Sequence, residues 1–309
     1  MKILVTGAAG FIGSNLVARL LELNYEVIGV DNLFSGYKSN LPQDFKLLEF
    51  DIARDKLDVV LPSEITHVVH LASHVGQEIS FEEPARDLEI NLVGTAKLLE
   101  WAEKNSKPKI IFSSSMSIYG NPIHPEHACR EDEPVKLNSP YSLGKYGAEK
   151  LLDIFGSRGI ESCILRLFNV YGTKQDLSNL KQGMVSIYAS YILKDSPIIV
   201  KGSLERTRDF IHVNDVINAI LICLESDAIG TLNVCSGQPT VLGNLIDELL
   251  SAFDKVPGTY PIDIFESTPG DQYRIFGDNS KLKELGWEPS VSLTAGLLEL
   301  SKWAKLNNS

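Results

Sequence analysis

A chain of 309 residues, 44% hydrophobic and 22% charged, has the composition of a globular protein, and it can form one large α/β domain or two closely packed ones. Its formal net charge of −11 argues against a general nucleic-acid binder, which usually presents a basic face. No apolar stretch approaches the length that spans a bilayer, and a strand pattern begins at Lys2, which leaves no room for a secretory leader. We therefore expect a cytoplasmic protein with neither nucleic acid nor membrane as a partner.

Strand and helix patterns alternate through the first half of the chain. The predicted strands are 2–6, 26–30, 46–49, 66–71, 108–113 and 161–167, and the predicted helices are 11–23, a long helix within 81–105, and 140–156. Such alternation is typical of right-handed βαβ units, which build a parallel sheet with helices on both faces. Ser139 is a good N-cap before Pro140, and Gly156 and Gly159 mark the end of that helix.

The second half is less regular. Short strands are predicted near 198–200, 209–212 and 231–234, and helices near 182–194, 213–225, 241–253, 280–285 and 292–305. Pro and Gly interrupt residues 255–273, which predicts an irregular segment on the substrate side. The fold class expected from the whole pattern is α/β, a Rossmann-type doubly wound parallel sheet with a smaller α/β substrate-binding domain.

A glycine-rich turn follows the first predicted strand. Gly7 permits a tight turn with positive φ, Gly10 lets the backbone approach a phosphate group, and Gly13 lets the following helix pack closely on the strand. The helix N-terminus favours an anion there. Three glycines alone are a weak signal, but Asp31 ends the next strand at the spacing at which an acidic side chain meets an adenosine ribose. No basic residue follows before Lys38, so the pattern favours NAD over NADP.

Tyr141 and Lys145 are four residues apart on the predicted helix 140–156, which places both side chains on one face. A phenol has an ordinary pKa near 10, and an adjacent ammonium together with a positive nicotinamide would lower it. The alternative is an exposed Tyr and Lys on a surface helix. The hydroxyl-rich run 113–120 after a parallel strand favours the catalytic interpretation, because ligands bind at the carboxyl ends of such strands.

With these motifs, the chain resembles the extended short-chain dehydrogenase/reductases, in the NAD-dependent sugar-nucleotide epimerase/dehydratase family, with a pattern most similar to UDP-glucose 4-epimerases. The resemblance covers nearly the whole chain. The ordered blocks that carry it are 6–13, 31–33, 51–52, 70–72, 91–95, 113–120, 141–145, 165–172, 207–213, 233–237 and 269–271. It implies an NAD-binding domain of residues 1–168 plus 206–235, and a nucleotide-sugar-binding domain of residues 169–205 and 236–309.

The resemblance also implies roles for individual residues. Ser115, Tyr141 and Lys145 would be catalytic: Tyr141 would take a proton from a sugar hydroxyl held by Ser115, and Lys145 would bridge the nicotinamide ribose and Tyr141. The implied cofactor-binding residues are Gly7, Gly10, Phe11, Ile12, Gly13, Asp31, Asn32, Ser35, Gly36, Asp51, Ile52, Leu71, Ala72, Ser73, Asn91, Ser113, Tyr141, Lys145 and Phe168. The implied substrate-binding residues are His74, Ser115, Asn169, Arg208, Asp271 and Arg274. For Arg208 the alternative is an ion pair with Asp209.

Within this family the residues after Ser115 indicate the reaction. Dehydratases usually carry an Asp-Glu pair where this chain has Met116 and Ser117, and UDP-glucuronate decarboxylases carry a Glu where it has Ser117. These absences favour epimerisation at C4 through a transient 4-keto sugar, with NAD tightly retained. A nucleotide-sugar 4-ketoreductase or dehydrogenase is the alternative enzyme, and a non-catalytic NAD-binding sensor the alternative of another class.

Two departures from the family pattern concern the substrate. Thr268 stands where an Arg commonly anchors phosphate, and Arg274 is a candidate replacement. Ile275 falls near the position where the size of the side chain is associated with admitting an N-acetyl group. Its intermediate size does not indicate whether such a group is admitted. We expect a UDP-hexose. The resemblance also implies a homodimer, through the helices near 81–105 and 140–156.

The remaining polar residues are predicted to be structural. His70, His212 and Arg166 are expected in the core, and His124 and His127 in a solvated or substrate-gating loop with no metal. The four cysteines show no metal or redox spacing, and we expect Cys163, Cys223 and Cys235 to be buried, reduced thiols.

Overall fold

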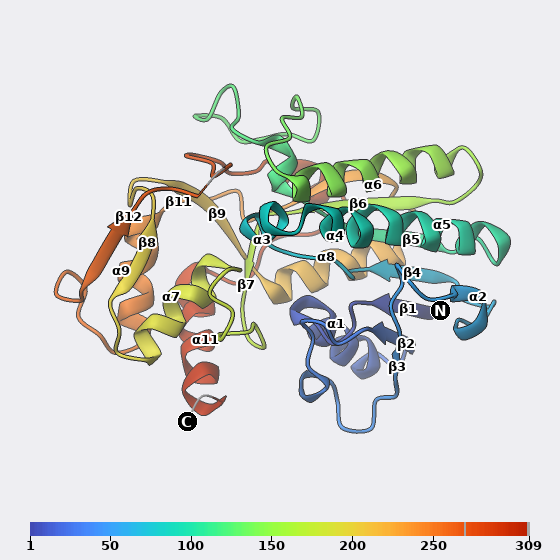
Figure 1. Ribbon diagram of the computed structural model, residues 1–309, viewed down its shortest axis with the longest axis horizontal. Helices are drawn as coiled ribbons and strands as arrows, with labels where there is room; N and C mark the ends of the chain where they lie inside the picture. The colour runs from blue at the N-terminus through green and yellow to red at the C-terminus, as the bar shows by residue number, and fades with distance from the viewer. Residues whose placement is uncertain (269, 308–309) are drawn as a thin grey trace. The chain divides into compact units, whose positions relative to one another are not determined.

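The computed structural model describes residues 1–268 and 270–307, so Pro269 of the block 269–271, and Asn308 and Ser309 of the predicted second domain, lie outside the described residues (Figure 1). The chain divides into two compact units. The first comprises Met1–Ile118, Leu137–Arg166 and Ile217–Leu232, and the second Tyr119–Lys136, Leu167–Val216 and Asn233–Ser309. Residues 119–136, 167–168, 206–216 and 233–235 belong to the second unit, whereas the predicted NAD-binding domain included them.

A seven-stranded parallel sheet is the centre of the first unit. Its strands are β1 (Lys2–Thr6), β2 (Glu26–Asp31), β3 (Leu47–Glu49), β4 (His67–His70), β5 (Lys109–Ser115), β6 (Ser162–Leu167) and β10 (Gly230–Val234). Their order is β10-β6-β5-β4-β1-β2-β3. The chain therefore extends the sheet from β1 through β2 and β3 on one side, and then through β4, β5, β6 and β10 on the other side. This reversal beside β1 is where a doubly wound sheet binds a dinucleotide. The predicted Rossmann-type fold is confirmed.

Helices cover both faces of this sheet, with α1 on the opposite face from α5 and α6 (Figure 1). The bounds are α1 (Phe11–Glu22), η1 (Lys38–Asn40), α2 (Leu57–Val60), α3 (Gln77–Glu82), α4 (Pro84–Leu88), η2 (Glu89–Val93), α5 (Gly94–Lys104), η3 (Met116–Tyr119), α6 (Pro140–Gly156) and α8 (Val213–Glu225). The long helix predicted within 81–105 is thus α4, a π-helical turn at η2, and α5. The predicted start of α6 is confirmed, because Ser139 accepts a hydrogen bond from the Ser142 N–H in a capping box before Pro140.

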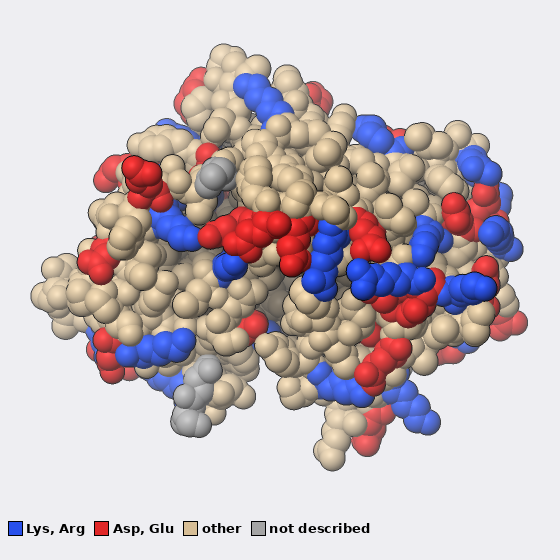
Figure 2. All heavy atoms as spheres, viewed as in Figure 1, with Lys and Arg blue, Asp and Glu red and all other residues tan. Residues whose placement is uncertain are grey.

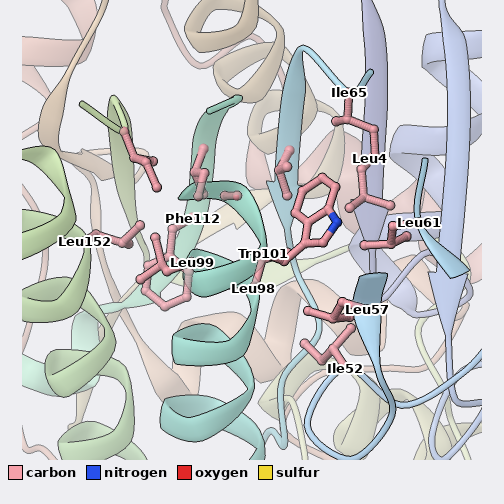
Figure 3. Close-up of a cluster of buried hydrophobic side chains, with 14 of the residues drawn as sticks. Leu4, Ile52, Leu57, Leu61, Ile65, Leu98, Leu99, Trp101, Phe112 and Leu152 are labelled. Carbon is pink, nitrogen blue, oxygen red and sulfur yellow. The ribbon is translucent and has the colours of Figure 1, made fainter. Parts of the chain in front are cut away.

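One hydrophobic core cluster of the first unit lies between the sheet and α5 and α6. Leu98, Leu99 and Trp101 of α5 pack with Phe112 of β5 and Leu4 of β1 (Figure 3). Each of these side chains is at most 2% exposed. This packing holds the start of α6 against the carboxyl end of β5, where the candidate catalytic residues lie.

The second unit contains two small sheets. Their strands are β7 (Asn169–Tyr171), β9 (Thr207–His212) and β11 (Pro239–Val241), in the order β11-β9-β7, and β8 (Ile198–Lys201) paired with β12 (Ile262–Phe265). Its helices are α7 (Met184–Leu193), α9 (Leu242–Ala252), α10 (Ser280–Glu284) and α11 (Leu293–Asn307). The segment 255–273 is therefore not wholly irregular: β12 forms there, and the sequence hid it because most of its side chains are exposed. The strand β9 pairs with β7 and β11, so it belongs to a small sheet and not to the seven-stranded sheet.

Acidic and basic side chains are interspersed on the face that Figure 2 shows. No helix within residues 1–268 and 270–307 is both long enough and apolar enough to cross a membrane. Cys163, Cys223 and Cys235 are buried free thiols, as predicted, and so is Cys129.

Candidate active site

The turn after β1 has the geometry that its glycines predict. Gly7 has φ +70°, and a Cβ added there would lie 2.7 Å from the Ala72 backbone nitrogen. A Cβ on Gly13 would lie 2.0 Å from the Gly7 carbonyl oxygen, so only glycine lets α1 pack this closely on the turn. Gly10 is the N-cap of α1. The first turn of this helix therefore presents backbone N–H groups beside the turn, which fits a dinucleotide pyrophosphate.

Asp31 connects this turn to the loop after β2. Its Oδ2 accepts a hydrogen bond from the Ala9 N–H at 2.9 Å and its Oδ1 one from the Leu33 N–H at 2.8 Å. Burial raises the pKa of this carboxyl group. Gly36 of the same loop packs on the turn, since a Cβ there would lie 2.8 Å from the Ala9 carbonyl carbon. Lys38 forms an ion pair with Glu49, which leaves an adenosine 2′-phosphate without that cation.

Further predicted cofactor-binding residues of the first unit follow β2, β3 and β4. Asn32 donates to Asp51 at 3.0 Å, and Asp51 in turn accepts from the Ala53 N–H at 2.8 Å. The Leu71 and Ala72 N–H groups donate to the carbonyl and hydroxyl oxygens of Thr6, at 3.1 and 3.2 Å. Phe11, Ile12, Ile52, Ser35, Ser73 and Ser113 also belong to the first unit, whereas Phe168 belongs to the second. Their contacts with NAD stay predictions.

An exposed aromatic contact connects the loops after β2 and β4. Phe34, in the loop after β2, lies beneath Arg86 of α4, whose Cζ is 4.0 Å from the centre of the Phe34 ring. The ring of His74, in the loop after β4, is 5.9 Å from the same ring. Because β1 lies between β4 and β2, contacts between these two loops span the carboxyl end of β1, where the glycine turn begins.

We expect Arg86→Ala to release NAD about 2- to 30-fold faster, because a cation–π contact contributes about 0.5–2 kcal/mol. The measurement is the loss of bound NAD from the purified protein after exchange into labelled NAD. Arg19→Ala is the matched control, since Arg19 pairs with Glu22 on the exposed face of α1. A release rate equal to that of the control would contradict a role for this contact in cofactor retention.

Tyr141 and Lys145 lie on the first two turns of α6, on the side facing β5. The Lys145 Nζ donates to the Ser113 carbonyl oxygen at 2.8 Å and lies 5.9 Å from the centre of the Tyr141 ring. The Tyr141 hydroxyl forms hydrogen bonds with the hydroxyls of Ser115 and Ser73. The structure thus brings together Ser115, Tyr141 and Lys145, which were predicted to be catalytic.

Burial dominates the ionisation of this pair. It raises the pKa of Tyr141 to about 12, although the hydrogen bonds with Ser115 and Ser73 lower it. It lowers the pKa of Lys145 to about 7. Among the groups of the chain, Lys145 therefore does not produce the predicted lowering of the Tyr141 pKa. An oxidised nicotinamide would bring a further positive charge to this site, and that charge would favour the phenolate.

The side-chain amide of Asn91 is held by hydrogen bonds within the chain. Its Oδ1 accepts from the Ser73 hydroxyl at 2.6 Å and the His74 N–H at 3.1 Å. Its Nδ2 donates to the His74 carbonyl oxygen and to Asp87, each at 3.0 Å. These four bonds use the hydrogen-bonding capacity of the amide. Asn91 therefore fixes the loop after β4 from the π-helical turn, and its contact with NAD stays a prediction.

Two buried clusters support the site from behind. Glu149, one turn after Lys145, accepts two hydrogen bonds from Arg166, at 3.0 and 2.8 Å, and one from Ser114. His70 forms hydrogen bonds with Thr6 at 2.7 Å and Thr95 at 3.0 Å, and burial lowers its pKa to about 3. The structural roles predicted for Arg166 and His70 are confirmed. Glu149 was not predicted, although its spacing of four from Lys145 was visible in the sequence.

The predicted substrate residues of the second unit form a cluster of their own. The guanidinium of Arg208 donates to Asp271 at 2.7 Å and to the backbone oxygens of Thr207, Gln272 and Tyr273. The alternative pairing of Arg208 with Asp209 is wrong, because the Asp209 carboxylate binds Ser236, Gly237 and Gly277 instead. The Asn169 amide donates to the Asp209 carbonyl oxygen at 2.8 Å.

Arg274 differs from Arg208 in the hydrogen bonding of its guanidinium group. Its backbone pairs with Thr207, and within the described part of the chain its buried Nε has no hydrogen-bond partner. Ile275, next to it, is 1% exposed. In the second unit, Arg208 is thus held in an internal ion pair with Asp271, whereas Arg274 has a donor still available.

Comparison with known proteins agrees with this geometry. Residues 3–235 match the model of the NAD dependent epimerase/dehydratase family. The chain belongs to this family. Among its relatives, the UDP-glucose 4-epimerase of Mycolicibacterium smegmatis is 34% identical, with 96% of each chain covered. UDP-glucuronic acid decarboxylase 5 of Arabidopsis thaliana is 32% identical, over 96% of this chain and 87% of the relative.

Among solved structures, the UDP-glucose 4-epimerase of Thermus thermophilus in complex with NAD has a TM-score of 0.90 and 31% identity, with 99% of each chain covered. The family's dependence on NAD confirms the predicted cofactor. The chain is therefore an NAD-dependent nucleotide-sugar enzyme. Relatives of nearly equal identity carry the names of different reactions, so the reaction has to be argued from the residues.

Proposed function

We propose that this enzyme epimerises a UDP-linked hexose at C4 through a transient 4-keto sugar. One observation carries the proposal: Tyr141 is hydrogen-bonded to Ser115 and lies beside Lys145, while Met116 and Ser117 stand where elimination or decarboxylation would need acidic groups. Acid–base chemistry at one hydroxyl is what this set of side chains can perform.

Each residue of the set has a distinct role in this proposal. Tyr141 takes the proton of the C4 hydroxyl and later returns it, while Ser115 holds that hydroxyl by a hydrogen bond. Lys145, when protonated, places a positive charge beside the phenol, and it is itself oriented by the Ser113 carbonyl oxygen. Bound NAD supplies the hydride acceptor at C4 and the hydride donor for the opposite face. The hydroxyl of Ser117 has no charge with which to remove a proton from carbon or to polarise a carboxylate.

The nucleotide is assigned to groups of the second unit, and Arg274 is the proposed anchor in place of the missing Arg at 268. We expect Arg274→Ala to weaken UDP binding by about 10- to 100-fold, because a hydrogen bond to a charged group contributes about 1.5–3 kcal/mol. Titration calorimetry with UDP measures the effect. Arg130→Ala, which removes an exposed guanidinium paired with Asp132, is the control. Equal affinities in the two variants would exclude Arg274 as the anchor.

The proposal also includes a homodimer formed through the helices of the first unit. Val93 of η2 and Leu143 and Ile154 of α6 are large apolar side chains that are 45%, 47% and 57% exposed. Burying them against a second copy would remove apolar surface from water. Sedimentation equilibrium of the wild type and of Leu143→Asp tests this, and a wild-type monomer would contradict it.

The reaction is tested by incubating the purified protein with candidate UDP-hexoses without added cofactor and following the stereochemistry of the product by NMR. The proposal predicts a C4 epimer with no net change in NADH. Stoichiometric formation or consumption of NADH would establish a dehydrogenase or ketoreductase instead. Bound NAD with no turnover of any nucleotide sugar would indicate a sensor. Tight binding of GDP-, CDP- or dTDP-sugars in place of UDP-sugars would refute the assignment of uridine.

A further inference from the structure

A buried carboxylate lies beside the candidate catalytic pair without any role in the proposed reaction. Asp87 of α4 is 0% exposed. Its Oδ2 accepts a hydrogen bond from the Asn91 amide at 3.0 Å and lies 3.4 Å from the His74 Nδ1. Its Oδ1 is buried and has no hydrogen-bond partner in the range 1–268 and 270–307. Burying a carboxylate oxygen without a hydrogen-bond partner costs free energy, so the presence of Asp87 at this position indicates an electrostatic role.

The unpaired oxygen faces α6 at one position. A Cβ added to Gly144 would lie 3.6 Å from the Asp87 Oδ1 and 3.1 Å from the Asn91 Cβ. Gly144 immediately precedes Lys145 and follows Tyr141 by three residues, so the helix approaches the carboxylate between the two catalytic candidates. The negative charge of Asp87 acts on both side chains: it raises the pKa of Tyr141 and that of Lys145.

The other charged groups near Asp87 and Lys145 are either paired with an opposite charge or lie farther away. Glu149 also acts on Lys145, but Arg166 holds it through two hydrogen bonds. Glu83 lies 3.9 Å from the Nε2 of His74, and its side chain is half exposed. Asp87 therefore faces His74, Tyr141 and Lys145 with no arginine or lysine bonded to it within the described residues.

We propose that Asp87 is a positioning residue whose carboxylate, held by Asn91 and His74 against Gly144, is the counter-charge of Lys145. It touches neither substrate nor cofactor and acts through Lys145 and Tyr141. The inference rests on the proposed function only in taking these two residues as the catalytic pair.

The physical consequence is a change in ionisation. Burial lowers the pKa of Lys145 to about 7 even though the Asp87 charge opposes that loss of the ammonium. The same charge disfavours the phenolate of Tyr141. Removing it without changing the shape of the side chain must therefore lower the pKa of both groups.

The variant that tests this is Asp87→Asn, and its direct readout is the NMR titration of the ε-methylene of Lys145 in the holoenzyme labelled with ¹³C-lysine. The signal is assigned by its loss in Lys145→Arg. We expect the midpoint to fall by at least about half a pH unit relative to the wild type, because Asp87 raises the pKa of Lys145. Both limbs of the pH profile of kcat should move to lower pH in the same direction.

Glu89→Gln is the matched control, because it removes a negative charge from the adjacent π-helical turn, where Glu89 pairs with Arg54 at 3.0 Å. We expect it to move neither the Lys145 midpoint nor the pH profile. If Asp87→Asn does not fold by circular dichroism, Asp87→Ser retains an acceptor for Asn91 and replaces it in the test.

An unchanged Lys145 midpoint, with kcat lowered equally at every pH, would overturn the proposal and leave Asp87 a purely structural role. A shifted midpoint in an enzyme that turns over no UDP-hexose would uphold the counter-charge and refute the proposed function. The two failures are therefore distinguishable.

Discussion

Replacing Tyr141 with Phe is expected to lower kcat by about 10²- to 10⁴-fold, the range that a positioned general base contributes. The substitution removes the hydroxyl that is bonded to Ser115 and Ser73 and preserves the ring packed beside Lys145. The NAD content of the purified protein should stay equal to that of the wild type, because the glycine turn and Asp31 are unaffected. The rate is measured by NMR of the product, and the NAD by its absorbance after denaturation.

A matched control for this variant is Tyr146→Phe, one turn along α6, where the phenol lies beneath Lys150 and is not among the groups around Ser115. This control should keep its full rate. A Tyr141→Phe enzyme that retained most of its activity would remove the phenol from the mechanism, whatever its NAD content.

Gly13→Ala is expected to have the largest effect on the fold and on NAD binding. The new methyl group would lie 2.0 Å from the Gly7 carbonyl oxygen and 3.0 Å from the Ala8 Cα, both backbone atoms that no rotamer change can move. Overpacking of this kind costs about 1–3 kcal/mol or more, which lowers the thermal midpoint by several degrees, about 2–4 °C per kcal/mol. Any relief by outward movement of α1 would displace the N–H groups proposed to bind the pyrophosphate.

Gly156→Ala is the control for the glycine turn. A Cβ added to this residue, at the end of α6, meets nothing within 4 Å, so NAD content and thermal midpoint should not fall. If Gly13→Ala bound NAD as tightly as Gly156→Ala, the close packing of α1 on the turn would not be what forms the cofactor site.

Local signals in the sequence predicted the parts of the fold that local physics determines. The alternation of strand and helix, the Ser139 cap and the three glycines act over a few residues, and the structure confirms the sheet, the start of α6 and the turn. The spacing of Tyr141 and Lys145 likewise needed only helical periodicity. The π-helical turn at η2 could not be predicted from the sequence. Its register depends on the hydrogen bonds of Asn91 with the backbone of a loop 17 residues away.

Long-range pairing accounts for most of what the sequence did not reveal. Asp271 is 63 residues from Arg208, and its ion pair with that arginine was hidden among many charged residues. Asp87 stands in a run with Glu82, Glu83 and Glu89 that has the composition of an exposed helix, although it is fully buried. The pKa of Tyr141 was predicted to fall because the sequence shows a neighbouring charge but not the depth of burial.

The most direct test of C4 epimerisation follows a label at the reacting carbon. UDP-hexose carrying deuterium at C4 is converted in ordinary water, and the product is analysed by NMR and mass spectrometry. Deuterium retained at C4 of the epimer is the predicted result, because the hydrogen leaves and returns within one closed site while Tyr141 exchanges only the hydroxyl proton. Replacement of that deuterium by solvent hydrogen would contradict the account.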